Sequence, residues 1–365
     1  MNPIRSLAAL AAVSTLAACN TYSPPDPTAL ANPEMLRVLT AYQGLGAQPV
    51  QTLSVAQARS QPTMGDAAGS VATQMGIPTR QPVSQISDIT IQGAAGPLNA
   101  RVYNPKVAAG PAPVILYFHG GGWVTGNLDT YDASDRELAK GTGAIVVSVQ
   151  YRLGPENRFP AAHDDANAAY SWLLQNAASM GGDPQKIALA GESAGGNMAI
   201  DTAIWARDNH LQAPVHQLLI YPVAGVDLNT TSYGETLRAV PLNRLAIQWY
   251  VANYTNDPAE LQDARLNVIG AADLRGLPPT TIISAQIDPL RSEGEALAKK
   301  LQSLGVNVEQ RTYSGVTHEF FGMGNVVPQA KQAEEFAFAR LTTSFTQPPA
   351  PIPTPRYRGY RRPQS

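Results

Sequence analysis

Residues 187–196 read Ile-Ala-Leu-Ala-Gly-Glu-Ser-Ala-Gly-Gly. The first four are an apolar run typical of a buried strand, and a helical pattern follows over residues 197–207. Between them lies the G-x-S-x-G pattern of a nucleophile elbow, a turn that exposes a serine hydroxyl. A side chain two positions before or after Ser193 would clash in so tight a turn. We therefore expect a strained backbone at Ser193 with its Oγ exposed.

The same alternation of strand and helix continues on both sides of this turn. A leading hairpin is expected at 87–92 and 98–103. Further strands are expected at 114–118, 144–149, 187–190, 218–221, 281–284 and 306–313, with helices at 161–178, 197–207, 293–303 and 329–345. Short apolar strands separated by amphipathic helices indicate an α/β fold, with a mostly parallel sheet covered on both faces. Ligands then bind at the carboxyl ends of the strands.

Two stretches do not follow this alternation. Residues 26–75 contain helical signals at 29–42 and 55–59, and residues 225–272 form an insertion with a helical signal at 244–253. Segments that flank or interrupt a sheet are candidates for a lid over the site. We expect a cap segment at 29–82 and a core at 83–345 that carries the insertion.

Composition excludes several classes of protein. A length of 365 residues suits one large α/β domain with insertions or two to three smaller domains. The chain is 44% hydrophobic and carries a formal charge of -2. Such a charge rules out a strongly basic nucleic-acid binder and an acidic disordered chain. The single cysteine excludes an intramolecular disulfide and a thiolate zinc site, and no other cluster indicates a metal.

The N-terminus is typical of an export signal. Residues 1–18 contain one positive charge and an apolar stretch, and Cys19 follows directly. The sequence Leu16-Ala17-Ala18-Cys19 resembles the lipobox of bacterial lipoproteins, whose cysteine receives a lipid and becomes the mature N-terminus. We expect a lipid-anchored protein of the cell envelope, in the outer membrane if the organism has one, with residues 19–28 as a tether. The alternative is an ordinary signal peptide cut near Ala18.

The C-terminal residues 346–365 contain six prolines, four arginines and no acidic residue. Such a segment buries too little apolar surface to fold, so a disordered tail is expected. It is either a solvated end of no specific function or a contact for anionic lipid or cell-wall polymer.

A glycine-rich loop precedes the elbow in the chain. The strand at 114–118 runs into His119-Gly120-Gly121-Gly122-Trp123. Consecutive glycines expose backbone N–H groups without side chains between them, which is what a tetrahedral oxyanion requires. We expect oxyanion donors from Gly120, Gly121 and Ala194, and a structural role for His119.

A serine at neutral pH needs a base, and the base needs an orienting carboxylate. With an elbow of this kind the acid and then the histidine follow the serine, each after a later strand. His318 comes in the loop after the strand at 306–313, and Asp288 follows the strand at 281–284. His210 ends a helix, and His216 directly precedes a strand. The other acidic residues considered lie in the insertion or begin a helix: Asp257, Asp263, Asp273 and Glu293.

Six motifs occur in an order known from one family: His119-Gly120-Gly121-Gly122-Trp123, Tyr151-Arg152-Leu153-Gly154-Pro155-Glu156, Phe159-Pro160-Ala161-Ala162, Gly191-Glu192-Ser193-Ala194-Gly195-Gly196, Asp288-Pro289-Leu290 and His318-Glu319-Phe320-Phe321. Over about residues 86–345 they resemble the hormone-sensitive-lipase-like family of α/β-hydrolases. The resemblance implies an α/β-hydrolase fold, a helical cap and hydrolysis of carboxylic esters, usually with short acyl chains. Gly154, Glu192 and Ser292 depart from the common pattern, and none of them is the nucleophile, base or acid.

The expected activity is therefore that of a serine carboxylesterase with Ser193, His318 and Asp288 as its triad. No metal or organic cofactor is needed, and the expected partners are a small ester and the membrane. Two alternatives remain open, namely amide or peptide hydrolysis at the same site and a lipid-anchored binding module with an inactive fold. The natural substrate, acyl-chain length and oligomeric state are left open.

Overall fold

The structure is a computed structural model that describes residues 26–107 and 110–347. The predicted signal peptide, Cys19, most of the predicted tether and residues 348–365 of the predicted tail lie outside these residues. Within the described ranges, no helix has both the length and the apolar character needed to cross a membrane.

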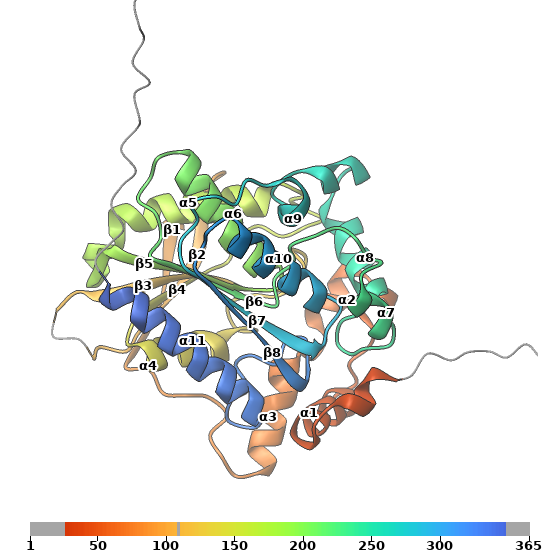
Figure 1. Cartoon of the computed structure of the whole chain (residues 1–365). Coiled ribbons are helices and arrows are strands. Elements are labelled where there is room, and N and C mark those ends of the chain that lie inside the picture. The colour runs from red at the N-terminus through yellow and green to blue at the C-terminus, as the bar shows by residue number, and fades with distance from the viewer. Residues whose placement is uncertain (1–25, 108–109, 348–365) are drawn as a thin grey trace, which may run out of the picture.

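An eight-stranded sheet forms the centre of the molecule (Figure 1). Its order is β1-β2-β4-β3-β5-β6-β7-β8. The strands are β1 (Gln85–Gln92), β2 (Pro97–Asn104), β3 (Ala112–Phe118), β4 (Ile145–Val149), β5 (Gly182–Glu192), β6 (His216–Ile220), β7 (Thr280–Ile287) and β8 (Val308–Thr317). Only the pairs β1 with β2 and β2 with β4 are antiparallel. The prediction of a mostly parallel sheet behind a leading hairpin is confirmed.

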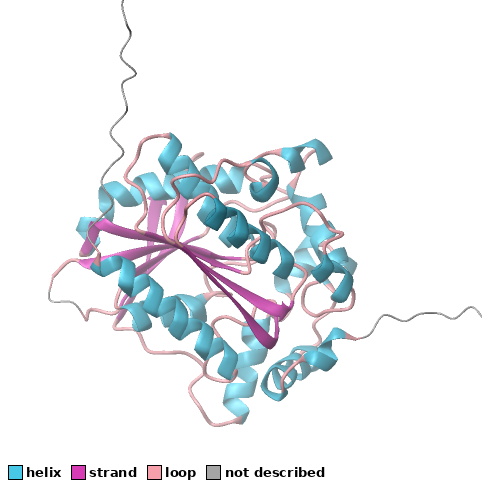
Figure 2. Cartoon of the chain, viewed as in Figure 1, coloured by secondary structure: helices cyan, strands magenta, loops and turns pink. Residues whose placement is uncertain are grey.

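Helices cover both faces of the sheet, as Figure 2 shows. α5 (Ala161–Asn176), α6 (Ala194–Asp208) and α10 (Arg291–Ser303) lie on one face, and α4 (Asp132–Thr142) and α11 (Pro328–Thr346) on the other. The packing of β3 on both of its faces explains why its sequence is apolar throughout. Val114, Leu116 and Phe118 pack into the first core, while Ile115 and Tyr117 pack into the second. Alternate side chains of a strand point to opposite faces, so a sheet covered twice needs continuous apolar strands.

Two groups of helices lie outside this sandwich. The N-terminal group comprises η1 (Pro27–Leu30), α1 (Pro33–Gly44), η2 (Val50–Thr52), α2 (Val55–Ser60) and α3 (Met64–Gln74). The second group, between β6 and β7, comprises α7 (Thr231–Glu235), α8 (Arg244–Tyr254), η4 (Pro258–Gln262) and α9 (Val268–Ala271). α2, α7 and α8 lie together at one end of the sheet (Figure 1), and η2 packs on α8.

The first of these helices begins later than predicted. A continuous helix was expected at 29–42, but a 3₁₀ turn at Pro27–Leu30 is followed by a separate start at Pro33. The side chain of Asn32 accepts a hydrogen bond from Met35 N, and Pro33 occupies the first helical turn. Asparagine as N-cap with proline directly after it is a strong signal for a helix start.

Candidate active site

Ser193 sits at the turn between β5 and α6 with φ 56° and ψ −117°. Its N–H donates to the carbonyl of Ile220 on β6 at 2.9 Å. Two flanking glycines make this turn possible. A Cβ at Gly191 would lie 2.2 Å from the carbonyl oxygen of Gly195, and a Cβ at Gly195 would lie 1.9 Å from that of Phe118. No side chain fits at either position, so the backbone lifts Ser193 into the strained conformation of an elbow.

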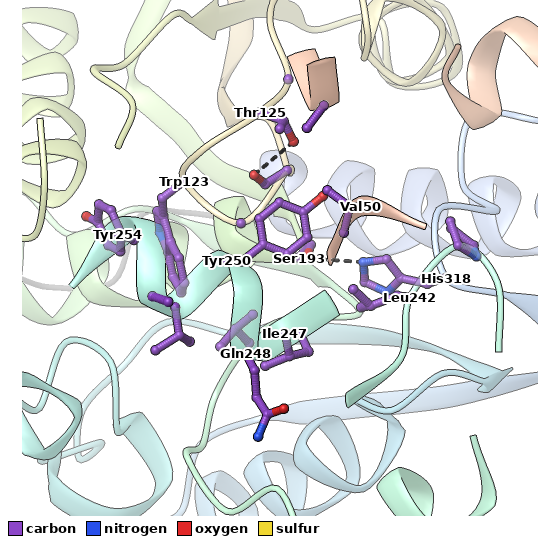
Figure 3. Close-up of a pocket in the computed structure, with 18 of the residues that line it drawn as sticks. Val50, Trp123, Thr125, Ser193, Leu242, Ile247, Gln248, Tyr250, Tyr254 and His318 are labelled. Atoms are coloured by element: carbon purple, nitrogen blue, oxygen red, sulfur yellow. Dashed lines mark hydrogen bonds between the residues drawn. The ribbon is translucent and has the colours of Figure 1, made fainter. Parts of the chain in front are cut away.

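His318 connects Ser193 to Asp288 by two hydrogen bonds. Its Nε2 lies 3.1 Å from Ser193 Oγ (Figure 3). Its Nδ1 lies 2.7 Å from Asp288 Oδ2. An ionised carboxylate only accepts, so Nδ1 carries the proton and Nε2 is free to accept from the serine hydroxyl. The three residues follow β5, β7 and β8, whose carboxyl ends meet at one edge of the sheet.

The surroundings of His318 shift its pKa upward. Burial opposes its protonation, but the charge and hydrogen bond of Asp288 raise the pKa of His318 above its ordinary value. Asp288 is fully buried, and its other oxygen accepts a hydrogen bond from Leu290 N at 2.8 Å. The carboxylate is thus fixed in place while it stabilises an imidazolium.

The glycine loop after β3 faces the elbow. Gly121 and Gly122 have φ of +96° and +58°, a region that favours glycine. The carbonyl of Gly121 accepts from Val124 N at 3.0 Å and from Thr125 N at 2.9 Å, which closes the loop. Ala194 is the first residue of α6, and the first N–H groups of a helix have no partner within it. The N–H groups expected as oxyanion donors therefore come from this loop and from the start of α6.

His119 lies in this loop, and none of its hydrogen bonds or ring contacts within the described residues is with Ser193. Its Nδ1 is 2.8 Å from the carbonyl oxygen of Gly120, and its ring stacks on Tyr151 at 4.2 Å. Burial lowers the pKa of His119 to about 4, so the ring is neutral. These contacts hold the loop in shape, as the sequence had suggested for this histidine.

The other candidates from the sequence lie elsewhere. His210 follows the end of α6, and His216 on β6 pairs with Ser344 and Thr281. Glu293 does more than begin a helix, because it accepts hydrogen bonds from the N–H groups of Ala224 and Gly225 and from a tyrosine hydroxyl. Burial raises the pKa of Glu293 to about 7.

A cavity of about 1160 Å³ opens above Ser193 and His318. Both helical groups line it, with Val50 from η2 and with Ile247 and Tyr250 from α8 (Figure 3). Leu242, in the loop before α8, also lines it. One wall is aromatic, because Trp123 stacks on Tyr254 with ring centroids 4.8 Å apart and planes at 12°.

Tyr250 is a site residue that the sequence did not reveal. A Cβ at Gly122 would lie 2.3 Å from two ring atoms of Tyr250, so helix α8 presses this ring against the glycine loop. Burial raises the pKa of Tyr250 to about 12, and a hydrogen bond with Thr125 partly offsets that rise. The position of Tyr250 depends on how an insertion folds back over the core, and no local motif indicates it.

Arg59 on α2 joins the N-terminal group to the site. Its guanidinium donates to the carbonyls of Val124 at 2.9 Å and Gly154 at 2.7 Å, and it pairs with both carboxylate oxygens of Glu156. Val124 lies just after the glycine loop, so this one side chain ties α2 to the loop and to the turn at Gly154.

No group of three or more His, Cys, Asp or Glu side chains in residues 26–107 and 110–347 is arranged to hold a metal ion.

Residues 115–322 match a family model described as alpha/beta hydrolase fold. Carboxylesterase NlhH of Mycobacterium tuberculosis (strain ATCC 25618 / H37Rv) is 43% identical over 250 residues, which are 66% of this chain and 76% of that protein. Ethyl acetate hydrolase of Pseudomonas putida is 35% identical, over 68% of this chain and 79% of that protein. Among solved structures, the hyperthermophilic esterase from the archaeon Pyrobaculum calidifontis is similar with a TM-score of 0.77 and 36% identity, covering 86% of this chain and 98% of that chain.

Proposed function

The chain belongs to the hormone-sensitive-lipase-like family of α/β-hydrolases and is a carboxylic ester hydrolase, and from this premise we propose that Ser193, His318 and Asp288 are its catalytic triad. The observation that carries the proposal is the pair of hydrogen bonds at His318, 3.1 Å to Ser193 Oγ and 2.7 Å to Asp288 Oδ2. A serine beside a neutral imidazole nitrogen, with a buried carboxylate on the other nitrogen, is the arrangement that activates a hydroxyl for attack.

In the first half of the reaction, Ser193 Oγ attacks the ester carbonyl carbon and its proton passes to His318 Nε2. Asp288 holds the imidazole and stabilises its positive charge. The negative charge on the carbonyl oxygen is stabilised by the N–H groups of Gly120, Gly121 and Ala194. His318 then protonates the leaving alcohol, and an acyl group remains on Ser193. Water repeats the sequence and releases the acid.

The test of this triad is the hydrolysis of p-nitrophenyl acetate by Ser193→Ala. We expect kcat/KM to fall by about 10⁴-fold or more, the scale seen when a serine hydrolase loses its nucleophile. Ser303→Ala is the matched control, because it makes the same change at an exposed serine on the end of α10. A Ser193→Ala protein that is folded and as active as Ser303→Ala rejects the proposal.

The acyl group is proposed to be short. Support comes from the relative named for ethyl acetate and from the aromatic wall of Trp123 and Tyr254. A series of p-nitrophenyl esters from acetate to laurate measures the preference. We expect kcat/KM to be highest between acetate and hexanoate and to decline beyond that, and a maximum at laurate contradicts the proposal.

We also propose that Cys19 carries a lipid that anchors the enzyme to the cell envelope, in the outer membrane if the organism has one. The support is the sequence Leu16-Ala17-Ala18-Cys19 after an apolar stretch. The test is full-length protein expressed in a bacterium, with membrane fractionation and mass spectrometry of the mature N-terminus. We expect a lipidated Cys19 in the membrane fraction and loss of both in Cys19→Ala. An unmodified Cys19 in the mature protein contradicts the anchor.

A further inference from the structure

Glu319 is a strained carboxylate beside the proposed base. It directly follows His318, lines the cavity above Ser193 and is partly exposed within it. Its φ is +64°, in the left-handed region that residues with a side chain rarely adopt. Strained residues of this kind concentrate at functional sites, where the surrounding structure holds them in place.

The carboxylate of Glu319 has few partners compared with its buried neighbours. Glu192 binds the hydroxyls of Tyr117 and Tyr221, and Glu293 accepts three hydrogen bonds. For Glu319, the described part of the chain offers one hydrogen bond, from Tyr131 Oη at 3.5 Å. That distance is beyond the usual range, so most of the acceptor capacity of Glu319 is unused.

Two tyrosines from the helical groups line the cavity together with Glu319. Burial raises the pKa of Tyr42 on α1, and the charge of Glu319 raises it further. The same two causes act on Tyr250 of α8, and both residues line the cavity with Ser193. Each helical group thus supplies one tyrosine to the cavity that Glu319 also lines. The polar corner contrasts with the aromatic wall at Trp123 and Tyr254.

The chemistry of the proposed function indicates which part of the ester lies there. His318 Nε2 has to reach the leaving oxygen in order to protonate it, so the leaving alcohol lies next to His318. Glu319 is the adjacent residue. We propose that Glu319, together with the hydroxyls of Tyr42 and Tyr250, binds a free hydroxyl group on the leaving alcohol, so that the preferred substrates are short-chain monoesters of diols and polyols. This inference rests on the proposed triad.

A hydroxyl group suits this corner better than a quaternary ammonium group does. It donates a hydrogen bond to the carboxylate and accepts one from a phenol, whereas a quaternary ammonium has no hydrogen to donate. The aromatic rings and the carboxylate could also attract a cation, so the experiment compares the two chemistries directly.

Two matched pairs of acetate esters test the proposal. 2-Hydroxyethyl acetate and propyl acetate differ by a hydroxyl in place of a methyl group, and acetylcholine and 3,3-dimethylbutyl acetate differ by a cationic nitrogen in place of a carbon. The measured quantity is the ratio of kcat/KM within each pair, because a general loss of activity cancels in a ratio. Glu319→Met removes the acceptor, and Glu319→Gln retains an oxygen without charge.

We expect Glu319→Met to lower the hydroxyethyl-to-propyl ratio about tenfold, the effect of a hydrogen bond to a charged group, and Glu319→Gln to lower it less. Tyr131→Phe removes the hydroxyl that lies 3.5 Å from Glu319, and we expect it to leave the ratio near that of the wild type. The proposal is overturned if both Glu319 variants keep the wild-type ratio, or if only the acetylcholine pair responds.

A second measurement needs no variant. The acyl-enzyme formed from p-nitrophenyl acetate passes its acetyl group to water or to an added alcohol, and the alcohol enters where the leaving alcohol departed. Ethylene glycol has two equivalent hydroxyls, so at equal concentrations of ethylene glycol and 1-propanol we expect clearly more than twice as much 2-hydroxyethyl acetate as propyl acetate. A product ratio of two or less contradicts the subsite. Failure of the triad proposal gives a different result, because Ser193→Ala would then retain activity on p-nitrophenyl acetate.

Discussion

Among single residues, the behaviour of a buried carboxyl group depends on the partners that surround it. Asp288 and Glu192 are both buried carboxyls near the elbow, yet they have different environments. Asp288 faces the imidazole of His318 and stabilises its protonated form, whereas Glu192 binds two tyrosine hydroxyls. Both oxygens of the Glu192 carboxylate have a tyrosine hydroxyl as partner.

The raised pKa of His318 predicts the acidic limb of the pH profile. Only the neutral imidazole can accept the proton of Ser193, so kcat/KM falls as pH drops through the pKa of His318, which lies above 6.5. Asp288→Asn removes the charge that raises this pKa. We expect kcat/KM for p-nitrophenyl acetate to drop by orders of magnitude in this variant, with its residual acidic limb at lower pH. A limb at unchanged pH contradicts the role given to Asp288.

Glu192 predicts a pH-dependent contribution to stability. Burial raises the pKa of Glu192 to about 7 from an ordinary value of 4.5, so the folded protein binds this proton more tightly than the unfolded chain does. The contribution is complete below pH 4.5 and is lost as pH rises to about 7. It amounts to about 3 kcal/mol at most. We expect Glu192→Gln to lose less unfolding free energy than the wild type between pH 5 and 8 in urea titrations. Equal losses contradict this assignment.

At the scale of elements, local sequence predicted most of the sheet but, among the described residues, missed the helices α3 and α4 and the short helices α7 and α9. The strands were recognisable because both of their faces are buried, and the elbow and glycine loop because their tight turns permit few residue types. α4 was missed because Asp132, Ser134 and Asp135 are buried on it, which obscures the apolar period. Its carboxylate Asp132 binds Tyr103 and Arg136 instead of solvent. Such pairing is visible only after the chain has folded.

The elements over the site were the hardest to place from the sequence. α3 contains two glycines and is defined by the capping box of Thr63 and Asp66. Tyr250 and Arg59 act through contacts with residues 65 to 128 positions away, so no local pattern indicates them. The residues proposed for catalysis were predicted because motifs carry them, and the residues that shape the cavity were not.

The contacts of Arg59 predict that α2 supports the glycine loop. In Arg59→Ala, the carbonyls of Val124 and Gly154 lose their donor and Glu156 loses its partner. We expect faster hydrogen exchange in α2 and in the loop, with a lower kcat for p-nitrophenyl acetate. The control is Arg37→Ala, because Arg37 forms an exposed pair within α1. If Arg59→Ala exchanges at the same rate as this control, α2 does not support the loop.

At the scale of the whole molecule, the N-terminal helices are part of the folded body. Met35 and Val38 of α1 and Val71 of α3 are buried in the same core as β3 and α11. The cap is therefore not an appendage that could be removed without exposing apolar surface.

Two truncations test this integration. A protein lacking residues 1–25 keeps every described contact, and we expect it to fold and to hydrolyse p-nitrophenyl acetate. A protein lacking residues 1–82 exposes the core beneath α1 and α3, and we expect it to be insoluble or to unfold at a much lower temperature. A stable and fully active protein without residues 1–82 contradicts this view of the cap.

Covalent labelling measures whether Ser193 is the nucleophile. A p-nitrophenyl phosphonate ester reacts when Oγ attacks phosphorus and p-nitrophenolate leaves, so the label stays on the attacking residue. We expect one label per chain on the peptide that contains Ser193, released p-nitrophenol in equal amount, and loss of esterase activity in parallel. A label on another residue, or full activity in protein whose Ser193 is completely labelled, shows that Ser193 is not the nucleophile.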